Sequence, residues 1–190
     1  MSKNQLTPDE RSLLLKQARK ALVCGVTGTP LDPLKLDEYS NMLRQPGATF
    51  VTLTVDGQLR GCVGALEAYQ PLVEDVREHA VAAALQDYRF TPVQPNELAH
   101  ISIEISRLTP PEPLDYVDPE ELLAKLHPGI DGVVLRDGLS RSTFLPQVWE
   151  KLPDPESFLD HLCQKMGAPA DLWRKKNLDV FVYQVEEFHE

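Results

Sequence analysis

The sequence has few cysteines, and it lacks the close pairs that a disulfide framework or a structural zinc site requires. Its three cysteines, Cys24, Cys62 and Cys163, are odd in number and far apart. Small secreted folds pair their cysteines, and zinc sites place Cys or His residues at short spacings. No Cys-x-x-Cys or His-Glu-x-x-His pattern occurs. We therefore expect neither a disulfide nor a metal held by this chain alone, and no motif names a cofactor.

The chain also lacks long apolar runs and an excess of positive charge. No segment approaches the roughly 20 apolar residues that a membrane helix needs, so we expect a cytoplasmic protein that does not bind membranes. The formal net charge is −10. This charge disfavours nucleic acid as a partner, because phosphate binding usually needs a basic surface. The densest basic run, 174–176, is typical of a solvated helix end, and only a local RNA site stays open there.

What is present indicates hairpins and capped helices. Asp56-Gly57 and Asp137-Gly138 each separate two strand-like segments, and Asp-Gly suits a tight two-residue turn. Residues 71–88 have apolar side chains at helical spacing, and residues 101–108 and 180–185 read as strands. Three predicted helices begin with a capping residue followed directly by proline. The capping residues are Thr7, Asp118 and Asp154.

This order of elements predicts the α+β class, with antiparallel β-sheets and packed helices of the two-layer sandwich type. Hairpins dominate, and the strict β-α-β alternation of a doubly wound fold is missing. The stiff, proline-rich stretch 109–113 marks a boundary between two lobes. We expect the closing strand, within 178–188, to return to the larger lobe.

The segment 59–64, Leu-Arg-Gly-Cys-Val-Gly, is the most unusual in the chain. Glycine within a strand often marks the close approach of another backbone or of a ligand, which singles out Gly61 and Gly64. Strand alternation predicts that Arg60 and Cys62 share a face, where the arginine would favour a reactive thiolate or a soft-metal ligand. The alternative is a small cysteine packed in a tight strand.

Two further segments could bind an anion. In Asp87-Tyr-Arg-Phe-Thr-Pro92, a turn after the helix would let Asp87 face Arg89, with Phe90 beside them. The alternative is an arginine on the last helix carbonyls with Phe90 as a core residue. Pro146 and Gln147 read as the start of a helix, whose free N–H groups would attract an anion. The alternative there is a turn packed by large apolar residues.

His161 and Lys165 lie four residues apart on the predicted helix 155–166. They could form an acid/base couple or be two solvated residues.

Four blocks together resemble the AMMECR domain family. They are Leu-Arg-Gly-Cys-Val-Gly at 59–64, Asp-x-Arg-Phe-x-Pro at 87–92, Leu-Pro-Gln-Val at 145–148 and Leu-Cys-x-Lys-Met-Gly at 162–167. Order and spacing agree over essentially the whole chain, 1–190, as a single domain. Trp149, following the third block, gives a form similar to the bacterial branch called AmmeMemoRadiSam system protein A. Val63 stands where isoleucine is commoner.

The resemblance implies two lobes with a cleft between them, and gene neighbours that are a Memo-like protein and a radical SAM enzyme. It implies no established reaction and leaves open whether the protein is an enzyme. Our leading hypothesis is an enzyme or enzyme component for a small anionic ligand or a modified residue. The predicted catalytic residues are Cys62, Arg60 and Asp87. The predicted ligand-binding residues are Gly61, Gly64, Arg89, Phe90, Pro146, Gln147 and Lys165.

Two alternatives remain, a non-catalytic binding module for those partners and, more weakly, an RNA-associated regulator. The site hypothesis makes geometric predictions. A two-residue turn at Asp56-Gly57 would pair Leu53 with Arg60, and Val51 with Cys62. Cys62 should be mostly buried at a cleft wall. Asp87 is the expected charge partner of Arg60, or else of Arg89, because a covered guanidinium needs one.

Overall fold

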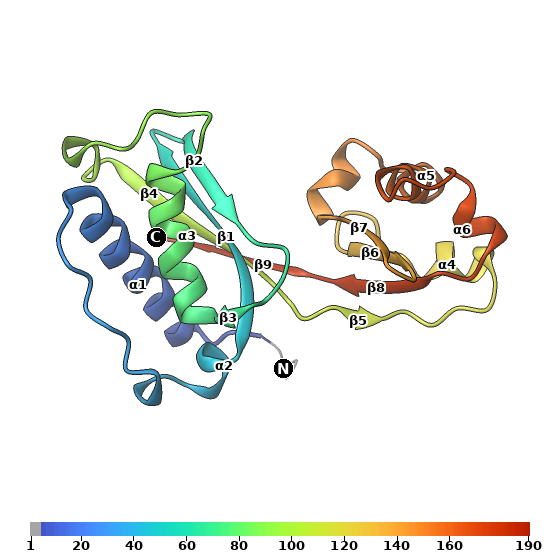
Figure 1. Ribbon diagram of the computed structural model, residues 1–190, viewed down its shortest axis with the longest axis horizontal. Coiled ribbons are helices and arrows are strands. Elements are labelled where there is room, and N and C mark those ends of the chain that lie inside the picture. The colour runs from blue at the N-terminus through green and yellow to red at the C-terminus, as the bar shows by residue number, and fades with distance from the viewer. Residues whose placement is uncertain (1–4) are drawn as a thin grey trace. The chain divides into compact units, whose positions relative to one another are not determined.

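The computed structural model describes residues 5–190 and divides them into two compact units. Unit 1 comprises the chain up to Thr109 together with Glu186–Glu190, and unit 2 comprises Pro110–Val185. Each unit combines an antiparallel sheet with helices (Figure 1). The predicted α+β class is therefore confirmed.

Unit 1 is a sheet with its helices gathered on one face. Its elements are α1 (Pro8–Thr27), a 3-10 turn η1 (Leu36–Glu38), α2 (Asn41–Arg44), β1 (Pro46–Val55), β2 (Gln58–Gly64), β3 (Gln70–Pro71), α3 (Leu72–Leu85), η2 (Pro95–Glu97), β4 (Ile101–Leu108) and β9 (Val185–His189). The strand order is β2-β1-β4-β9, with the short β3 beside β1. Apolar residues of α1 and α3 pack on the inward side chains of β1 and β4 to form one core.

The start of α1 follows from its sequence. Thr7 accepts a hydrogen bond from the Glu10 backbone, and the Glu10 carboxylate accepts one from the Thr7 backbone, which completes a capping box. Pro8 occupies the first helical position, where no N–H is needed. These features were predicted, and they are confirmed.

The first hairpin has the predicted turn but not the predicted register. Asp56 and Gly57 both have positive φ, as a two-residue turn of this kind requires. Opposite the step from Leu53 to Thr54, a β-bulge in β2 then shifts the pairing, with Arg60 as the extra residue. Leu53 lies opposite Gly61, and Thr52 lies opposite Cys62. The expected pairs Leu53–Arg60 and Val51–Cys62 are wrong, because a bulge inserts one residue into the ladder.

Gly61 lies where the sheet meets α3. A Cβ atom at this position would lie 2.1 Å from the backbone carbonyl oxygen of Ala83. Any side chain there would force strand and helix apart, so close packing of β2 against α3 requires glycine. Since neighbouring side chains alternate, Cys62 points to the face of the sheet away from α3, with Thr52.

Unit 2 is a four-stranded sheet with short helices. Its elements are β5 (Glu112–Pro113), α4 (Pro119–Lys125), β6 (Gly132–Asp137), β7 (Ser140–Phe144), η3 (Pro146–Glu150), α5 (Pro155–Lys165), α6 (Leu172–Lys175) and β8 (Asp179–Tyr183). The strand order is β5-β8-β6-β7. Trp149 stacks on Phe158 with ring centroids 3.7 Å apart and donates its N–H to the Asp131 carbonyl. Trp173 is also buried in this core.

The predicted helix starts in unit 2 are confirmed, and its hairpin turn differs by one residue. Asp118 caps α4 through the Glu121 backbone, and Asp154 caps α5 through the Ser157 backbone. The turn between β6 and β7 comprises Gly138 and Leu139, because Asp137 still pairs with Ser140.

The end of the chain differs from expectation. Instead of one closing strand there are two, separated by Gln184. β8 pairs with β5 and β6 within unit 2, and β9 lies beside β4 in the unit 1 sheet. Only the second part of the expected strand region 178–188 therefore joins the unit 1 sheet.

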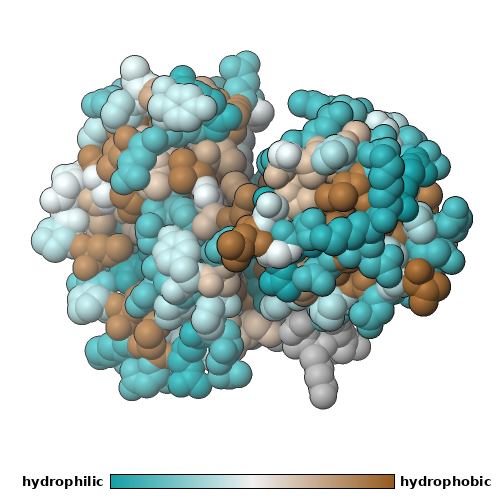
Figure 2. All heavy atoms as spheres, turned by 45° about the vertical axis from the view of Figure 1, so that its right-hand side comes forward, coloured by the Kyte–Doolittle hydropathy of each residue, from teal (hydrophilic) through white to brown (hydrophobic). Residues whose placement is uncertain are grey.

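On the face drawn in Figure 2, apolar residues occur as small separate groups among polar ones. Across residues 5–190, no helix has both the length and the apolar character needed to cross a membrane.

Candidate functional site

A polar cluster of unit 1 surrounds the carboxylate of Asp87, in the turn after α3. Asp87 is buried, and its Oδ2 accepts a hydrogen bond from the Cys62 backbone N–H at 2.8 Å. The Arg89 guanidinium donates from Nε to Oδ1 at 2.9 Å and from Nη2 to Oδ2 at 2.7 Å. The Arg89 backbone N–H adds a bond to Oδ1 at 3.1 Å. One carboxylate thus fixes both the turn and β2.

Charge explains why this carboxylate tolerates burial. The hydrogen bonds from Arg89 hold the pKa of Asp87 far below its usual range, against the opposing effect of burial, and the Cys62 N–H lowers it further. The same contact raises the pKa of Arg89. Asp87 is therefore ionised at neutral pH, and the pair is a bidentate, charge-assisted contact.

Arg89 keeps a surface available for another group. Its side chain is 45% exposed, and its guanidinium lies 5.6 Å from the Phe90 ring centre. Nη2 also approaches the Cys62 carbonyl at 3.4 Å. The predicted meeting of Asp87 and Arg89 in a turn after the helix is confirmed, and the carbonyl-capping alternative is not observed.

Arg60 does not belong to this cluster. Its Nε and Nη2 donate to the two carboxylate oxygens of Glu97, at 2.7 and 3.1 Å. This contact is the main cause that lowers the pKa of Glu97. The expected pairing of Arg60 with Asp87 is wrong. Because the bulge breaks strand alternation next to Arg60, the spacing of two residues no longer places it beside the Cys62 thiol.

Cys62 is half-buried rather than mostly buried. Its backbone is held by Asp87, and its sulfur accepts a hydrogen bond from the Thr52 hydroxyl at 3.3 Å. The thiol is thus fixed on the sheet face away from α3, with Arg89 bound to the carbonyl of the same residue. This arrangement provides a positioned sulfur next to a partly exposed cation. It can orient a nucleophile or a soft-metal ligand beside an anion.

The two glycines of the segment have packing explanations. Gly61 lies against the Ala83 carbonyl, and a Cβ atom at Gly64 would lie 2.3 Å from the Thr49 carbonyl oxygen. Both allow close backbone contact, which is sufficient to explain them without a ligand. Within residues 5–190, no group of three His, Cys, Asp or Glu side chains is suited to hold a metal ion.

The remaining predicted residues lie in unit 2. Pro146 begins η3, which is a five-residue 3-10 helix rather than the expected α-helix, and Gln147 is exposed on it. So short a helix has little of the dipole on which the anion-site prediction rested. Lys165 donates to the Thr143 carbonyl at 2.9 Å and lies 5.0 Å from the Phe144 ring centre. His161 contacts the Ser157 carbonyl of its own helix.

Each cation of the run 174–176 has an acidic neighbour. Arg174 pairs with Glu156, Lys175 with Asp171, and Lys176 with Asp137. These pairs offset the positive charge locally. They favour the solvated helix end over an RNA site.

Comparison with known proteins places the chain in a family. The AMMECR1 family profile matches residues 15–188. The chain belongs to the AMMECR1 family. A protein of Methanothermobacter thermautotrophicus is 39% identical over 187 residues, which cover 97% of this chain and 96% of that protein. A protein of Methanopyrus kandleri is 36% identical over 98% of this chain and 91% of its own length.

A solved structure in the comparison agrees with the fold of this AMMECR1 chain. It is the crystal structure of an uncharacterised protein, PH0010, from Pyrococcus horikoshii. The TM-score is 0.71 at 34% identity, over 94% of this chain and 90% of that one.

Sequence reasoning missed a second polar cluster of this AMMECR1 chain, buried under α3. Asp75 is fully buried, accepts a hydrogen bond from the Thr49 hydroxyl at 2.6 Å and contacts His79 Nδ1 at 3.1 Å. Its Oδ1 has no hydrogen-bond partner within residues 5–190. Asp75 and His79 are four residues apart on the apolar face of a predicted helix. That spacing of two polar residues on a buried face is the sequence feature that could have indicated the cluster. Glu97, the partner of Arg60, gave no local signal.

Proposed function

We propose that this AMMECR1 protein is an enzyme or enzyme component that binds a small anionic ligand, or an anionic modified residue, beside Cys62. The observation that carries the proposal is the Asp87 carboxylate, which holds the Cys62 backbone and the Arg89 guanidinium at once. Arg89 binds the anion with its exposed donors, and Cys62 acts as the nucleophile or as a ligand to a partner's metal. Arg60 serves as a positioning residue, because its ion pair with Glu97 ties β2 to η2.

Selective alkylation tests this proposal. The full chain is treated with iodoacetamide at pH 7, and the rates at Cys62 and at Cys24 are followed by peptide mass spectrometry. Cys24 is the internal control, because it is also only half-buried and lies on a different element. We expect Cys62 to react about tenfold faster, because its sulfur is held by Thr52 in a residue that also contacts the partly exposed Arg89 guanidinium. Inorganic phosphate or pyrophosphate should slow it, and Arg89→Gln should remove that protection.

Equal alkylation rates at the two cysteines, with no protection by either anion, would contradict the hypothesis that Cys62 is a catalytic residue. They would favour the second candidate, a non-catalytic binding module. The bond from the Thr52 hydroxyl to the Cys62 sulfur and the packing role of Gly61 support that candidate, since both are expected of a structural cysteine. A Cys62→Ser variant that retains full cellular function would then be expected.

We also propose that the protein belongs to the bacterial branch called AmmeMemoRadiSam system protein A. There it would act in the cytoplasm with a Memo-like protein and a radical SAM enzyme. The support is the Leu-Pro-Gln-Val-Trp sequence at 145–149. Purification of the tagged full chain from its natural host, followed by mass spectrometry, tests the partners. Recovery of neither protein under gentle conditions would speak against the association. The paired cations at 174–176 give no reason to extend the proposal to RNA.

A further inference from the structure

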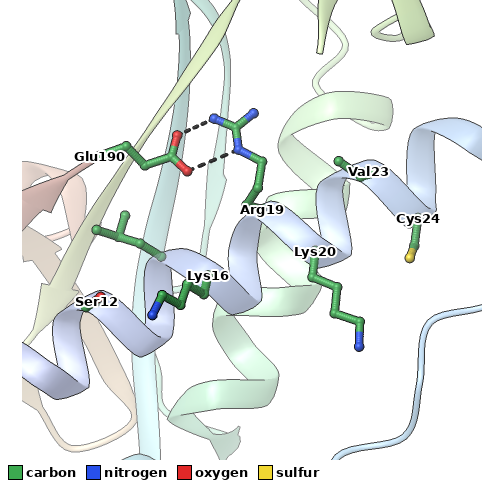
Figure 3. Close-up of a pocket in the computed structure, with 8 residues that line it drawn as sticks. Ser12, Lys16, Arg19, Lys20, Val23, Cys24 and Glu190 are labelled. Carbon is green, nitrogen blue, oxygen red and sulfur yellow. Dashed lines mark hydrogen bonds and ion pairs between the residues drawn. The ribbon is translucent and has the colours of Figure 1, made fainter. Parts of the chain in front are cut away.

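A groove of about 540 Å³ lies along the outer side of α1, within unit 1 and separate from the Cys62 cluster (Figure 3). It extends from Ser12 to Cys24, which spans roughly 18 Å at the rise of an α-helix. The aliphatic parts of its lining come from Leu15, Val23 and the stems of the basic side chains. Its volume lies in the range of small-molecule sites, which are mainly apolar with a few polar groups.

The polar groups of this groove are cations, in a protein whose formal net charge is −10. Lys16 and Lys20 are one helical turn apart, on the same side of α1 (Figure 3). Lys16 makes no hydrogen bond or ion pair with any residue of the described chain. Lys20 pairs with Asp32, whose side chain is 78% exposed. Such an exposed pair is weak, so a ligand carboxylate can replace Asp32.

The groove already holds one carboxylate. Arg19 donates from Nε to Glu190 Oε1 at 3.0 Å, and its Nη2 also contacts the Glu190 carboxylate, as the dashed lines in Figure 3 show. Arg19 is itself fixed by the backbone carbonyls of Leu98 and Ile101. A carboxylate is therefore bound at one edge of the groove. A second carboxylate could contact Lys16 directly, and Lys20 by replacing the exposed Asp32.

We propose that the α1 groove binds a small amphiphilic carboxylate, with its apolar chain along Leu15 and Val23 and its carboxylate between Lys16 and Lys20. The elongated apolar floor and the central cations match such a molecule in both shape and charge. A second copy of the same helix is a poorer match, because it would bring the lysines of two grooves together. This site shares no residue with the Cys62 cluster, so it stands or falls independently of the proposed function.

Octanoate is the probe. Sodium octanoate is titrated into the ¹⁵N-labelled full chain, and amide chemical shifts are followed. We expect saturable shifts at Leu15, Val23 and Cys24, and weaker binding of neutral octan-1-ol. The double variant Lys16→Ala/Lys20→Ala should bind octanoate about fivefold more weakly, as two exposed charge contacts would predict. Lys35→Ala is the matched control, because it removes an exposed lysine that lies outside the groove.

Four outcomes would overturn the proposal. Shifts confined to other surfaces would show that the groove is not the site. Equal binding of octanoate and octanol, or an unchanged affinity in the double lysine variant, would show that the carboxylate is not recognised. Displacement of octanoate by an acidic pentapeptide that binds more tightly would assign the groove to a protein partner instead. Thermal unfolding of each variant is measured in parallel, so that loss of binding is separated from loss of fold.

Discussion

The Asp87 carboxylate accepts a hydrogen bond from the Cys62 backbone N–H at 2.8 Å, although the two residues are 25 positions apart. Through this contact the turn after α3 holds the strand that carries the thiol. Arg89 completes the arrangement by binding both oxygens of the same carboxylate. The strand, the turn and the cation therefore depend on one buried ion.

Asp87→Asn should reduce the free energy of unfolding at pH 7 by about 2 kcal/mol, because it replaces a charge-assisted contact with a neutral one and weakens the bond to Cys62. Urea unfolding measures the loss. Asp154→Asn is the control, since that exposed helix cap also accepts a backbone N–H but Asn caps helices equally well. Equal stability of wild type and Asp87→Asn would contradict the role given to this ion.

The same pair predicts a pH dependence. The pKa of Asp87 is lower in the folded protein than the unfolded value of roughly 3.9, so its contribution is fully present above about pH 5. The contribution is lost as the pH falls from the unfolded pKa through the lower folded-state pKa. In this range a proton binds Asp87 more tightly in the unfolded chain than in the folded one, and so favours unfolding. The stability difference between wild type and Asp87→Asn should therefore shrink from pH 5 to pH 3. A difference that stays constant over this interval would contradict the assignment.

Gly61→Ala should destabilise the protein by about 3 kcal/mol or more, because the new Cβ would overlap the backbone carbonyl of Ala83. Backbone cannot move aside as a side chain can. Gly25→Ala is the matched control, since its Cβ would meet a side chain, that of Val81 at 2.9 Å, rather than backbone. Thermal unfolding compares the two variants, and a Gly61→Ala protein no less stable than Gly25→Ala would refute this packing argument.

Arg89→Gln should slow the alkylation of Cys62 at pH 7 about fivefold, because it removes a cation bound to the same residue. Arg60→Gln should change the rate by less than about twofold, since Glu97 already offsets the Arg60 charge. Mass spectrometry of the modified peptide gives both rates. The opposite ranking would restore Arg60 as the residue that activates the thiol.

Thr49→Val should lower the free energy of unfolding by about 2 kcal/mol, because Asp75 would lose its hydroxyl donor inside the core. Valine has nearly the same shape, so the measurement isolates the hydrogen bond. Thr54→Val is the control, on a half-buried position of the same strand. Equal effects of the two substitutions in urea unfolding would argue against a special role for the buried cluster.

The sequence by itself determined the local elements. Capping residues with prolines fixed the starts of α1, α4 and α5, and Asp56-Gly57 fixed a hairpin turn. It also indicated the family, because four different motifs typical of that family occur in the same order along this chain. The contact of Asp87 with Arg89 was within reach of sequence reasoning, since the two residues share one turn. All of these features depend on residues that are close in the chain.

Only the tertiary structure decided the rest. The bulge in β2 placed Cys62 opposite Thr52, and no pattern in the local sequence predicts that bulge. Glu97, not Asp87, became the partner of Arg60, and Asp75 became a buried residue bonded to the Thr49 hydroxyl. These outcomes depend on which side chains the fold brings together across long stretches of chain. Ion pairing and burial are set by that proximity, whereas caps and turns are set by neighbours in sequence.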